Sequence, residues 1–377
     1  MTWDYLIVGA GFAGAVLAER LASQMGAHCL VVDRRNHIGG NAHDHYDKAG
    51  VLIHTYGPHY FRTNSQRIVT YLSQFTEWHK VDYTILSSTH GRLWPFPINL
   101  NTFEKLLGRA SSTEEMEATL AEWRVQIDAP QNSEEMVLSQ VGRQFYEMFF
   151  KNYTRKQWGR DARQLDASVC GRIPLRKFQA LPKDGYTAMF KRMLEHPGIE
   201  VRLGCDYREV RRTENCRHLI YTGPIDEYFD YCHGRLPYRS LRFEAETLDQ
   251  EYFQPVVQVN YPNDHVFTRI VEIKHATGQK IPVTTIVREY PEEFAPGKEP
   301  YYPVPAPDAR TLYERYALLA QKEPWVSFVG RLATYRYYNM DQVIGAALAE
   351  FETLQQRYPR KMPPERTLGP AFQGIVD

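Results

Sequence analysis

Three glycines near the N-terminus have the spacing of a nucleotide-binding turn. Gly9, Gly11 and Gly14 follow the apolar stretch DYLIV and precede a helix-forming segment. In such a turn the first glycine allows the tight bend, the second lets a pyrophosphate approach the backbone, and the third lets helix and strand pack closely. Asp33 ends the next apolar stretch, where a carboxylate can bind a ribose hydroxyl. The pattern therefore predicts a dinucleotide site whose anion lies at a helix N-terminus.

A second glycine-rich segment indicates which dinucleotide is bound. Gly39, Gly40 and Asn41 follow the acid closely and allow a further approach to phosphate and to a large ring system. NAD-binding folds do not need this segment. It resembles the continuation found in flavin-binding proteins of the glutathione-reductase and amine-oxidase type, so the resemblance favours FAD. The predicted cofactor-binding residues of these motifs are Gly9, Gly11, Phe12, Ala13, Gly14, Asp33, Arg34, Gly40 and Asn41.

The elements that must position these residues predict an α/β fold with three parts. Residues 99–170 have Glu, Met, Leu and Ala at helical spacing, with SSTEE and NSEE as helix starts. Residues 235–315 contain short β-like runs separated by turn residues. We expect a Rossmann-like FAD-binding domain with an inserted helical domain and an antiparallel β-sheet domain. The expected boundaries are 1–80, 185–232 and 320–377 for the discontinuous FAD-binding domain, 99–175 for the helical domain that carries a mobile lid, and 81–98 with 233–319 for the sheet domain.

Composition and charge exclude several functional classes. The chain has 45 basic and 45 acidic residues, so its overall field favours neither nucleic acid nor an acidic membrane surface. Its five cysteines are odd in number and form no CxxC pair, which favours free thiols and a reducing compartment. No run approaches the ~18 apolar residues of a membrane span, and no signal peptide is recognisable. We therefore expect a cytoplasmic protein without a membrane span, and no metal site is predicted.

Motifs along nearly the whole chain together resemble the UDP-galactopyranose mutase family. They include GAGFAGAV, HIGGN, YGPHYFRT, PFPINLNT, YTRKQWG, RIPLR, YTGPIDEYFDY, FTRIVEIKH and GRLATYRYYNMD, in that order. The resemblance implies that reduced FAD interconverts UDP-galactopyranose and UDP-galactofuranose for galactofuranose glycan biosynthesis. The flavin N5 would form a covalent adduct with the sugar C1 while UDP leaves and returns, with no net redox change. It also implies an external reductant such as NAD(P)H, and we expect a homodimer or a larger homo-oligomer.

The same resemblance assigns roles to residues of this chain. Arg172 and Arg269 would be catalytic residues that stabilise the departing diphosphate, and His59 would lie against the flavin near N5. The implied substrate-binding residues are Phe149 under the uracil, Trp158 near the sugar, Tyr153, Tyr302 and Tyr337 on the diphosphate, and Arg331 at the flavin and sugar end. Further implied cofactor contacts are Tyr221, Gly223, Arg331, Met340 and Asp341. Arg239 and Glu289 would support the site, and a structural ion pair is the alternative for either one. Core packing is the alternative for Phe149 and Trp158.

Four features depart from the family pattern and affect the identity of the sugar. Arg62 stands where a second histidine is expected, Tyr83 replaces an asparagine near the sugar hydroxyls, and Asn339 occupies a position that is often aspartate. These three residues are also expected to bind the substrate. The chain also lacks about ten residues after RIPLR, where the family has a lid segment. Family members that accept N-acetylated sugars also resemble this chain in having the arginine.

Three alternatives follow from these departures and from the flavin motif. The first is the same ring contraction on UDP-N-acetylgalactosamine or dTDP-fucose, and Arg62 and Tyr83 motivate it. The second is a flavin oxidase with net redox chemistry, and the third is a non-catalytic nucleotide-binding protein. The paired arginines and the tyrosines argue against the oxidase, because an oxidase of neutral or cationic substrates does not need phosphate ligands such as Arg269 beside its flavin.

Overall fold

A five-stranded parallel sheet forms the nucleotide-binding part of the molecule. The computed structural model describes residues 2–170 and 177–358. The strand order is β10-β2-β1-β11-β17, and every neighbouring pair is parallel. The strands are β1 (Thr2–Val8), β2 (Cys29–Asp33), β10 (Ile199–Leu203), β11 (Asn215–Tyr221) and β17 (Val326–Phe328). The Rossmann-like α/β prediction is confirmed, and the strands come from three separate stretches of the sequence.

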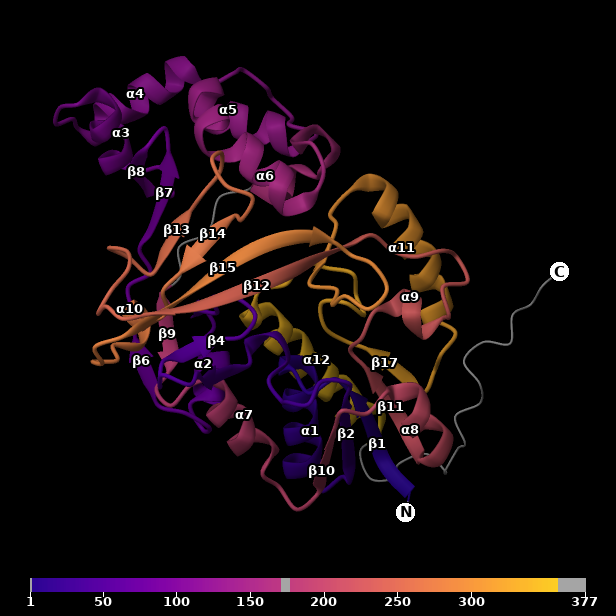
Figure 1. Ribbon diagram of the computed structural model, residues 1–377. Coiled ribbons are helices and arrows are strands. Elements are labelled where there is room, and N and C mark those ends of the chain that lie inside the picture. The colour runs from indigo at the N-terminus through magenta and orange to yellow at the C-terminus, as the bar shows by residue number, and fades with distance from the viewer. Residues whose placement is uncertain (1, 171–176, 359–377) are drawn as a thin grey trace.

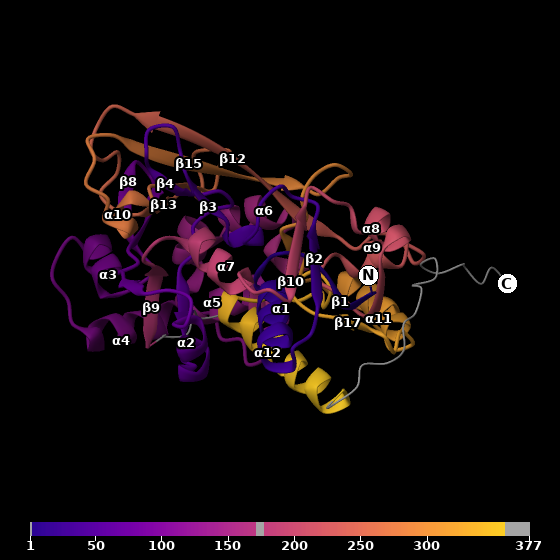
Figure 2. The same ribbon diagram turned by 90° about the horizontal axis from the view of Figure 1, so that it is seen from below.

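Helices cover both faces of this sheet, because its strands are apolar on both sides. Residue burial in β2 is nearly continuous, as is typical of a parallel strand. One face carries α1 (Phe12–Met25), α7 (Tyr186–Leu194) and α12 (Met340–Arg357), and Figure 2 shows α1 beside α12. The other face carries α8 (Tyr207–Thr213), α9 (Ile225–Tyr228) and α11 (Pro307–Ala320).

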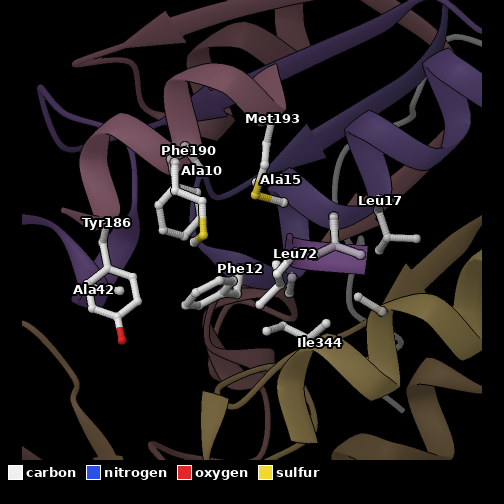
Figure 3. Packing of buried hydrophobic residues seen from close by; sticks show 14 of the residues in the cluster. Ala10, Phe12, Ala15, Leu17, Ala42, Leu72, Tyr186, Phe190, Met193 and Ile344 are labelled. Atoms are coloured by element: carbon white, nitrogen blue, oxygen red, sulfur yellow. The ribbon is translucent and has the colours of Figure 1, made fainter. Parts of the chain in front are cut away.

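The core beneath the glycine-rich turn is packed with aromatic rings. Phe12 at the start of α1 lies 4.7 Å from Phe190 and 6.2 Å from Tyr186, both on α7, between ring centroids. Figure 3 shows these rings together with Ile344 of α12. This packing fixes the start of α1, so the turn that precedes it is held rigidly.

A seven-stranded sheet forms the second part of the fold. Its order is β16-β12-β15-β14-β13-β7-β8. The strands are β7 (Ile85–Thr89), β8 (Arg92–Phe96), β12 (Tyr238–Leu248), β13 (Gln258–Asn260), β14 (Arg269–Val271), β15 (Thr284–Glu293) and β16 (Tyr302–Pro303). We expected an antiparallel sheet, and all pairs are antiparallel except β13 with β7, which is parallel. The difference arises because β7 and β8 form a separate hairpin that joins the edge of the later strands.

The helices of residues 100–158 contact β7, β8 and β15, and in Figure 1 they lie at the top of the view, with β1 and β10 at the bottom. They are α3 (Leu100–Leu107), α4 (Thr113–Trp123), α5 (Ser133–Phe145), the π-helical turn Tyr146–Phe150 and α6 (Lys151–Trp158). The predicted helix starts are confirmed, since the side chains of Ser112 and Asn132 accept hydrogen bonds from the amides of Glu115 and Glu135. The π-helical turn leads directly into α6.

The remaining elements are short and connect these parts. They are β3 (Asp44–Tyr46) with β4 (Leu52–His54), β5 (Phe61–Thr63) with β6 (Trp78–Lys80) and β9 (Phe178–Pro182), and the helices α2 (Gln66–Leu72) and α10 (Lys274–Thr277). All five cysteines are free, as expected. No helix in the described ranges is long and apolar enough to cross a membrane.

Candidate active site

A cavity of about 810 Å³ opens at the carboxyl end of the parallel sheet. Its volume lies within the range of about 300–1,000 Å³ for small-molecule and cofactor sites. Open α/β sheets bind ligands at this edge, where the strands end and the following helices begin. Predicted cofactor residues that line it are Gly9, Gly11, Phe12, Ala13, Asp33, Arg34, Gly40, Asn41, His59, Tyr221, Gly223, Arg331 and Met340.

The three glycines of the turn differ in what a side chain would meet. A Cβ on Gly14 would lie 1.9 Å from the carbonyl oxygen of Gly9, so this position serves the packing of helix on strand. Gly9 itself has a φ of +106°, and a Cβ there would lie 2.1 Å from Oγ1 of Thr222. Gly11 is different, because the nearest heavy atom to its Cβ would be Cα of Gly40 at 3.6 Å. Gly11 and Gly40 therefore bring bare backbone to the cavity lining from two sides.

Asp33 holds the glycine-rich turn as well as lining the cavity. Its Oδ2 accepts from the amide of Ala10 at 2.8 Å, and its Oδ1 accepts from the amide of Arg35 at 2.9 Å. The carboxylate is thus oriented before any ligand binds. Its acceptor capacity is not exhausted by two amides, so a ribose hydroxyl can still donate to it.

Acidic side chains from two parts of the chain hold the arginine that follows Asp33. Nη2 of Arg34 lies 3.4 Å from Oε2 of Glu299, and Nη1 lies 3.7 Å from Oε2 of Glu227. Glu299 also accepts from Nη2 of Arg35 at 2.9 Å. Because Glu299 precedes β16, this bridge links the second sheet to the cofactor cavity.

His59 also lines the cavity and is held as a neutral imidazole. Its backbone amide donates to Nδ1 of His54 at 3.0 Å, and its own Nδ1 lies 2.8 Å from the carbonyl oxygen of Gly57. Burial is the largest cause that lowers the pKa of His59 to about 3, and His54, Arg331 and Arg269 contribute to the same shift. The contact with a carbonyl requires that Nδ1 carries the proton, which leaves Nε2 as an acceptor.

The cavity lining fits FAD by its geometry and its chemistry. Bare backbone at Gly11 and Gly40 stands at the N-terminus of α1, where a pyrophosphate would be stabilised. The N-terminus of α12 contributes Met340 and Val343 to the lining, which also includes His59 and Arg331. Bare backbone at a helix N-terminus suits the pyrophosphate of a flavin dinucleotide, and the cavity volume suits a ligand of this size.

An arginine–glutamate pair stands next to the His59 end of the cavity. Nε and Nη2 of Arg269 each donate to Glu289 at 2.8 Å in a bidentate contact. Glu289 is 1% exposed, and a Cβ on Gly57 would lie 3.0 Å from its Oε2. Burial acts against the charge of Arg269, but Glu289 raises the pKa of the guanidinium well above its ordinary value. Arg269 is therefore a fixed cation, and no described residue accepts from its Nη1.

Three of the predicted substrate tyrosines gather around this cation. Burial raises the pKa of Tyr153 to about 12, although Arg269 acts in the opposite direction. Burial also raises the pKa of Tyr302, which is electrostatically coupled to Arg269 and Arg331. The rings of Tyr302 and Tyr337 lie 5.5 Å apart between centroids. Tyr153 and Tyr302 therefore stay protonated at neutral pH and can act as hydrogen-bond donors.

Trp158 and Arg331 join the same cluster. The indole of Trp158 lies 6.1 Å from the ring of Tyr302 and 5.9 Å from that of Tyr337. The guanidinium carbon of Arg331 lies 5.3 Å from the Tyr302 ring, and its Nη2 donates to the carbonyl of Tyr338 at 2.6 Å. Since Arg331 also lines the cofactor cavity, it links the two parts of the site. A permanent cation surrounded by phenols suits a diphosphate.

Two of the three residues that depart from the family pattern, Arg62 and Tyr83, contact each other. The guanidinium of Arg62 lies 4.4 Å above the ring of Tyr83, whose other neighbour is the Tyr60 ring at 4.1 Å. The Tyr83 hydroxyl donates to Oε1 of Gln258 at 2.6 Å. Arg269 and Arg62 both act to lower the pKa of Tyr83, although burial raises it overall. Arg62 and Tyr83 therefore form one wall beside the Arg269 cluster.

Some predicted residues are not brought into this cluster. Phe149 is 2% exposed and packs on Trp94, Phe96 and Phe145 in the helical part. Asn339 is exposed and stands before α12, where its amide donates to Gln342. Asp341 is buried. Arg172 and the position of the predicted lid lie outside the described residues, so their roles stay predictions.

Sequence reasoning missed several residues of the site. Glu299 lies between the two parts of the fold, and Gln258 lies on β13 under Tyr83. Neither belongs to a motif that indicates its contacts, because both act on residues far away in the sequence. The polar residue inside the apolar run VVQVN was the one available signal for Gln258.

Comparisons with known proteins agree with this geometry. The family model described as UDP-galactopyranose mutase matches residues 148–337, and a model for NAD(P)-binding Rossmann-like domains matches residues 7–75. A probable UDP-galactopyranose mutase of Klebsiella pneumoniae is 37% identical over 92% of this chain and 93% of its own. The dTDP-fucopyranose mutase of Escherichia coli is 34% identical over 91% of this chain and 96% of its own. A crystal structure of reduced UDP-galactopyranose mutase is similar with a TM-score of 0.75 at 15% identity, covering 94% of this chain and 96% of that one.

Proposed function

The chain belongs to the UDP-galactopyranose mutase family, and from this premise we propose that it interconverts UDP-galactopyranose and UDP-galactofuranose. Membership makes it an isomerase that uses FAD. The observation that carries the proposal is the fixed cation Arg269, surrounded by tyrosines beside the cofactor cavity. An isomerase that releases and recaptures UDP needs such a group, because charge develops on the diphosphate as the sugar leaves.

Residues of this chain would hold the cofactor and the nucleotide. Bound and reduced FAD would supply an electron-rich nucleophile for the anomeric carbon of the sugar. Gly11, Gly40 and the start of α1 hold its pyrophosphate. His59, neutral because burial lowers its pKa to about 3, adds no competing cation beside the flavin ring.

Arg269 and the tyrosines stabilise the departing UDP. Glu289 fixes the guanidinium through Nε and Nη2, which leaves Nη1 for a phosphate oxygen. Tyr153, Tyr302 and Tyr337 donate their hydroxyls to the same group. Because these donors are ordered before the sugar leaves, little reorganisation is needed as charge develops. Arg172 is proposed as the second arginine of this group.

A second candidate is the same reaction on another nucleotide sugar. The Escherichia coli dTDP-fucopyranose mutase is nearly as similar to this chain as the Klebsiella pneumoniae protein, at 34% against 37% identity. Arg62 and Tyr83 form the wall at which the sugar would be distinguished. UDP-N-acetylgalactosamine is the third substrate to test, since the arginine offers donors to an acetamido oxygen.

The cellular setting is part of the proposal. We place the enzyme in the cytoplasm, where its five free thiols stay reduced and NAD(P)H can reduce the flavin. The furanose product would enter galactofuranose glycans, and the active form would be a homodimer or a larger homo-oligomer.

The test is a substrate panel with purified, reduced protein. UDP-galactofuranose, UDP-N-acetylgalactofuranosamine and dTDP-fucofuranose are incubated separately, and pyranose formation is followed by chromatography. The proposal expects the highest kcat/KM for UDP-galactofuranose. A clear preference for either other sugar would transfer the assignment to the second candidate, and no conversion of any of the three would reject both.

A further inference from the structure

Arg239 on β12 is a buried arginine that does not pair with a carboxylate. The residue is 6% exposed, and its Nε and Nη2 donate to the carbonyl oxygens of Gln157 at 3.0 Å and Lys156 at 3.1 Å. No carboxylate of the described part of the chain lies within ion-pair distance of it. Burial lowers the pKa of its guanidinium, and the charge of Glu293, its β-ladder partner on β15, acts in the opposite direction. Burying a cation is costly unless its environment compensates, so this placement needs a structural reason.

The compensation comes from the C-terminus of helix α6. The last carbonyls of a helix lack intrahelical partners and carry a partial negative charge. Arg239 binds two of them, next to the point where Trp158 ends the helix. Gly159 follows with a φ of 64°, and a Cβ there would lie 2.5 Å from Nη1 of Arg239. The glycine therefore leaves the room that the guanidinium occupies.

The backbone of the same residue holds the opposite wall of the substrate site. The carbonyl of Arg239 accepts from the amide of Tyr301 at 2.8 Å, and Arg239 pairs with Tyr302 in the β12–β16 ladder. Helix α6 carries Tyr153 and Trp158. Arg239 thus connects α6, which bears Tyr153 and Trp158, to β16, which bears Tyr302.

We infer that Arg239 is a positioning residue that sets the separation between α6 and β16, and through it the geometry of nucleotide binding. This inference rests on the proposed function. Arg239 is absent from the lining of the cofactor cavity, so its effect should be confined to the nucleotide. A displaced α6 would move Tyr153 and Trp158 away from Tyr302. A misplacement of about 1 Å can lower the rate of an enzymatic reaction about 100-fold.

The test measures UDP binding and flavin content in matched variants. Arg239→Met keeps much of the side-chain volume and removes the donors, whereas Arg242→Met alters an arginine of the same strand whose side chain is 47% exposed. UDP affinity is measured by equilibrium dialysis and flavin per protein by absorbance. We expect Arg239→Met to bind UDP about 10- to 100-fold more weakly than wild type, the effect of losing about one well-placed phosphate contact, with unchanged flavin content. Arg242→Met should match wild type in both measurements.

Two further variants separate positioning from a general loss of stability. Arg239→Lys retains one cationic donor and should recover part of the UDP affinity. Gly159→Ala keeps the arginine but forces its guanidinium away from the helix end, so it should also weaken UDP binding. If Arg239→Met does not fold, the UDP affinities of these two variants test the inference instead.

The inference is overturned if Arg239→Met, or the two replacement variants, bind UDP like wild type while only the denaturation midpoint falls. Arg239 would then be a purely structural residue. Failure of the proposed function gives a different result, because wild-type protein would itself bind no UDP at millimolar concentration. That result removes the premise of the inference as well.

Discussion

Replacing Arg269 should have two separable effects, one on nucleotide binding and one on stability. The guanidinium is the proposed ligand of the departing diphosphate, and it is also the partner of Glu289, which is 1% exposed. Arg269→Ala removes both interactions at once. A loss of activity in this variant alone therefore does not identify the role of the residue.

The magnitudes follow from the geometry. A charge-assisted hydrogen bond contributes about 1.5–3 kcal/mol, so losing one phosphate contact should weaken UDP binding about 10- to 150-fold. Leaving the Glu289 carboxylate buried without its partner should cost about 3–5 kcal/mol of stability. Replacing both residues by neutral ones removes the unpaired charge, and such replacements of buried pairs are often close to neutral.

The assay compares Arg269→Ala with the double variant Arg269→Ala/Glu289→Gln. Denaturation midpoints in urea report stability, and dialysis reports UDP affinity. We expect the second substitution to restore much of the lost stability but none of the UDP affinity, with flavin bound in both variants. If UDP affinity recovers together with stability, Arg269 supports the fold and is not a phosphate ligand.

Three further predictions concern the cofactor, pH and the sugar. Gly11→Ala should fold, because its Cβ would meet no heavy atom of the protein closer than 3.6 Å, but it should lose most of its flavin absorbance because the Cβ occupies the approach of the pyrophosphate. Gly14→Ala should instead lower the yield of folded protein, because its Cβ would lie 1.9 Å from a carbonyl oxygen. Burial lowers the pKa of His218 from 6.5 to about 4, so the folded protein binds fewer protons than the unfolded chain between these values. Stability should fall by about 3 kcal/mol per such histidine as the pH falls from 6.5 to 4, and His218→Gln should show a shallower decline of the urea midpoint over that window. Arg62→His should raise kcat/KM for UDP-galactofuranose relative to UDP-N-acetylgalactofuranosamine roughly ten-fold, which corresponds to about one charge-assisted hydrogen bond. An unchanged ratio would show that Arg62 and Tyr83 do not distinguish the two sugars.

The local parts of the fold could be predicted from the sequence. The turn at Gly9 to Gly14 and the caps at Ser112 and Asn132 depend on residues only a few positions apart. Because neighbouring residue types determine the backbone conformation of such turns and caps, periodicity and capping rules identify them. The position of Asp33 at the end of β2 follows in the same way.

The long-range parts could not be predicted in this way. The pairing of β13 with β7 joins residues about 170 positions apart in the chain, and neither strand carries a pattern that selects its neighbour. Glu299 and Arg239 act through contacts with Arg34 and the end of α6, which only the folded chain brings near. The resemblance to a known family supplied the substrate residues, and the sequence left open whether Phe149 binds the uracil or packs in an apolar core, where the structure places it.

Turnover of UDP-galactofuranose by one preparation in two redox states is the most direct measurement. Protein with bound FAD is divided, one half is reduced with dithionite, and both halves are assayed under anaerobic conditions. An electron-rich flavin beside the Arg269 cluster predicts rapid formation of UDP-galactopyranose by the reduced half and almost none by the oxidised half. Equal rates in the two halves, or full activity in protein without flavin, would contradict it.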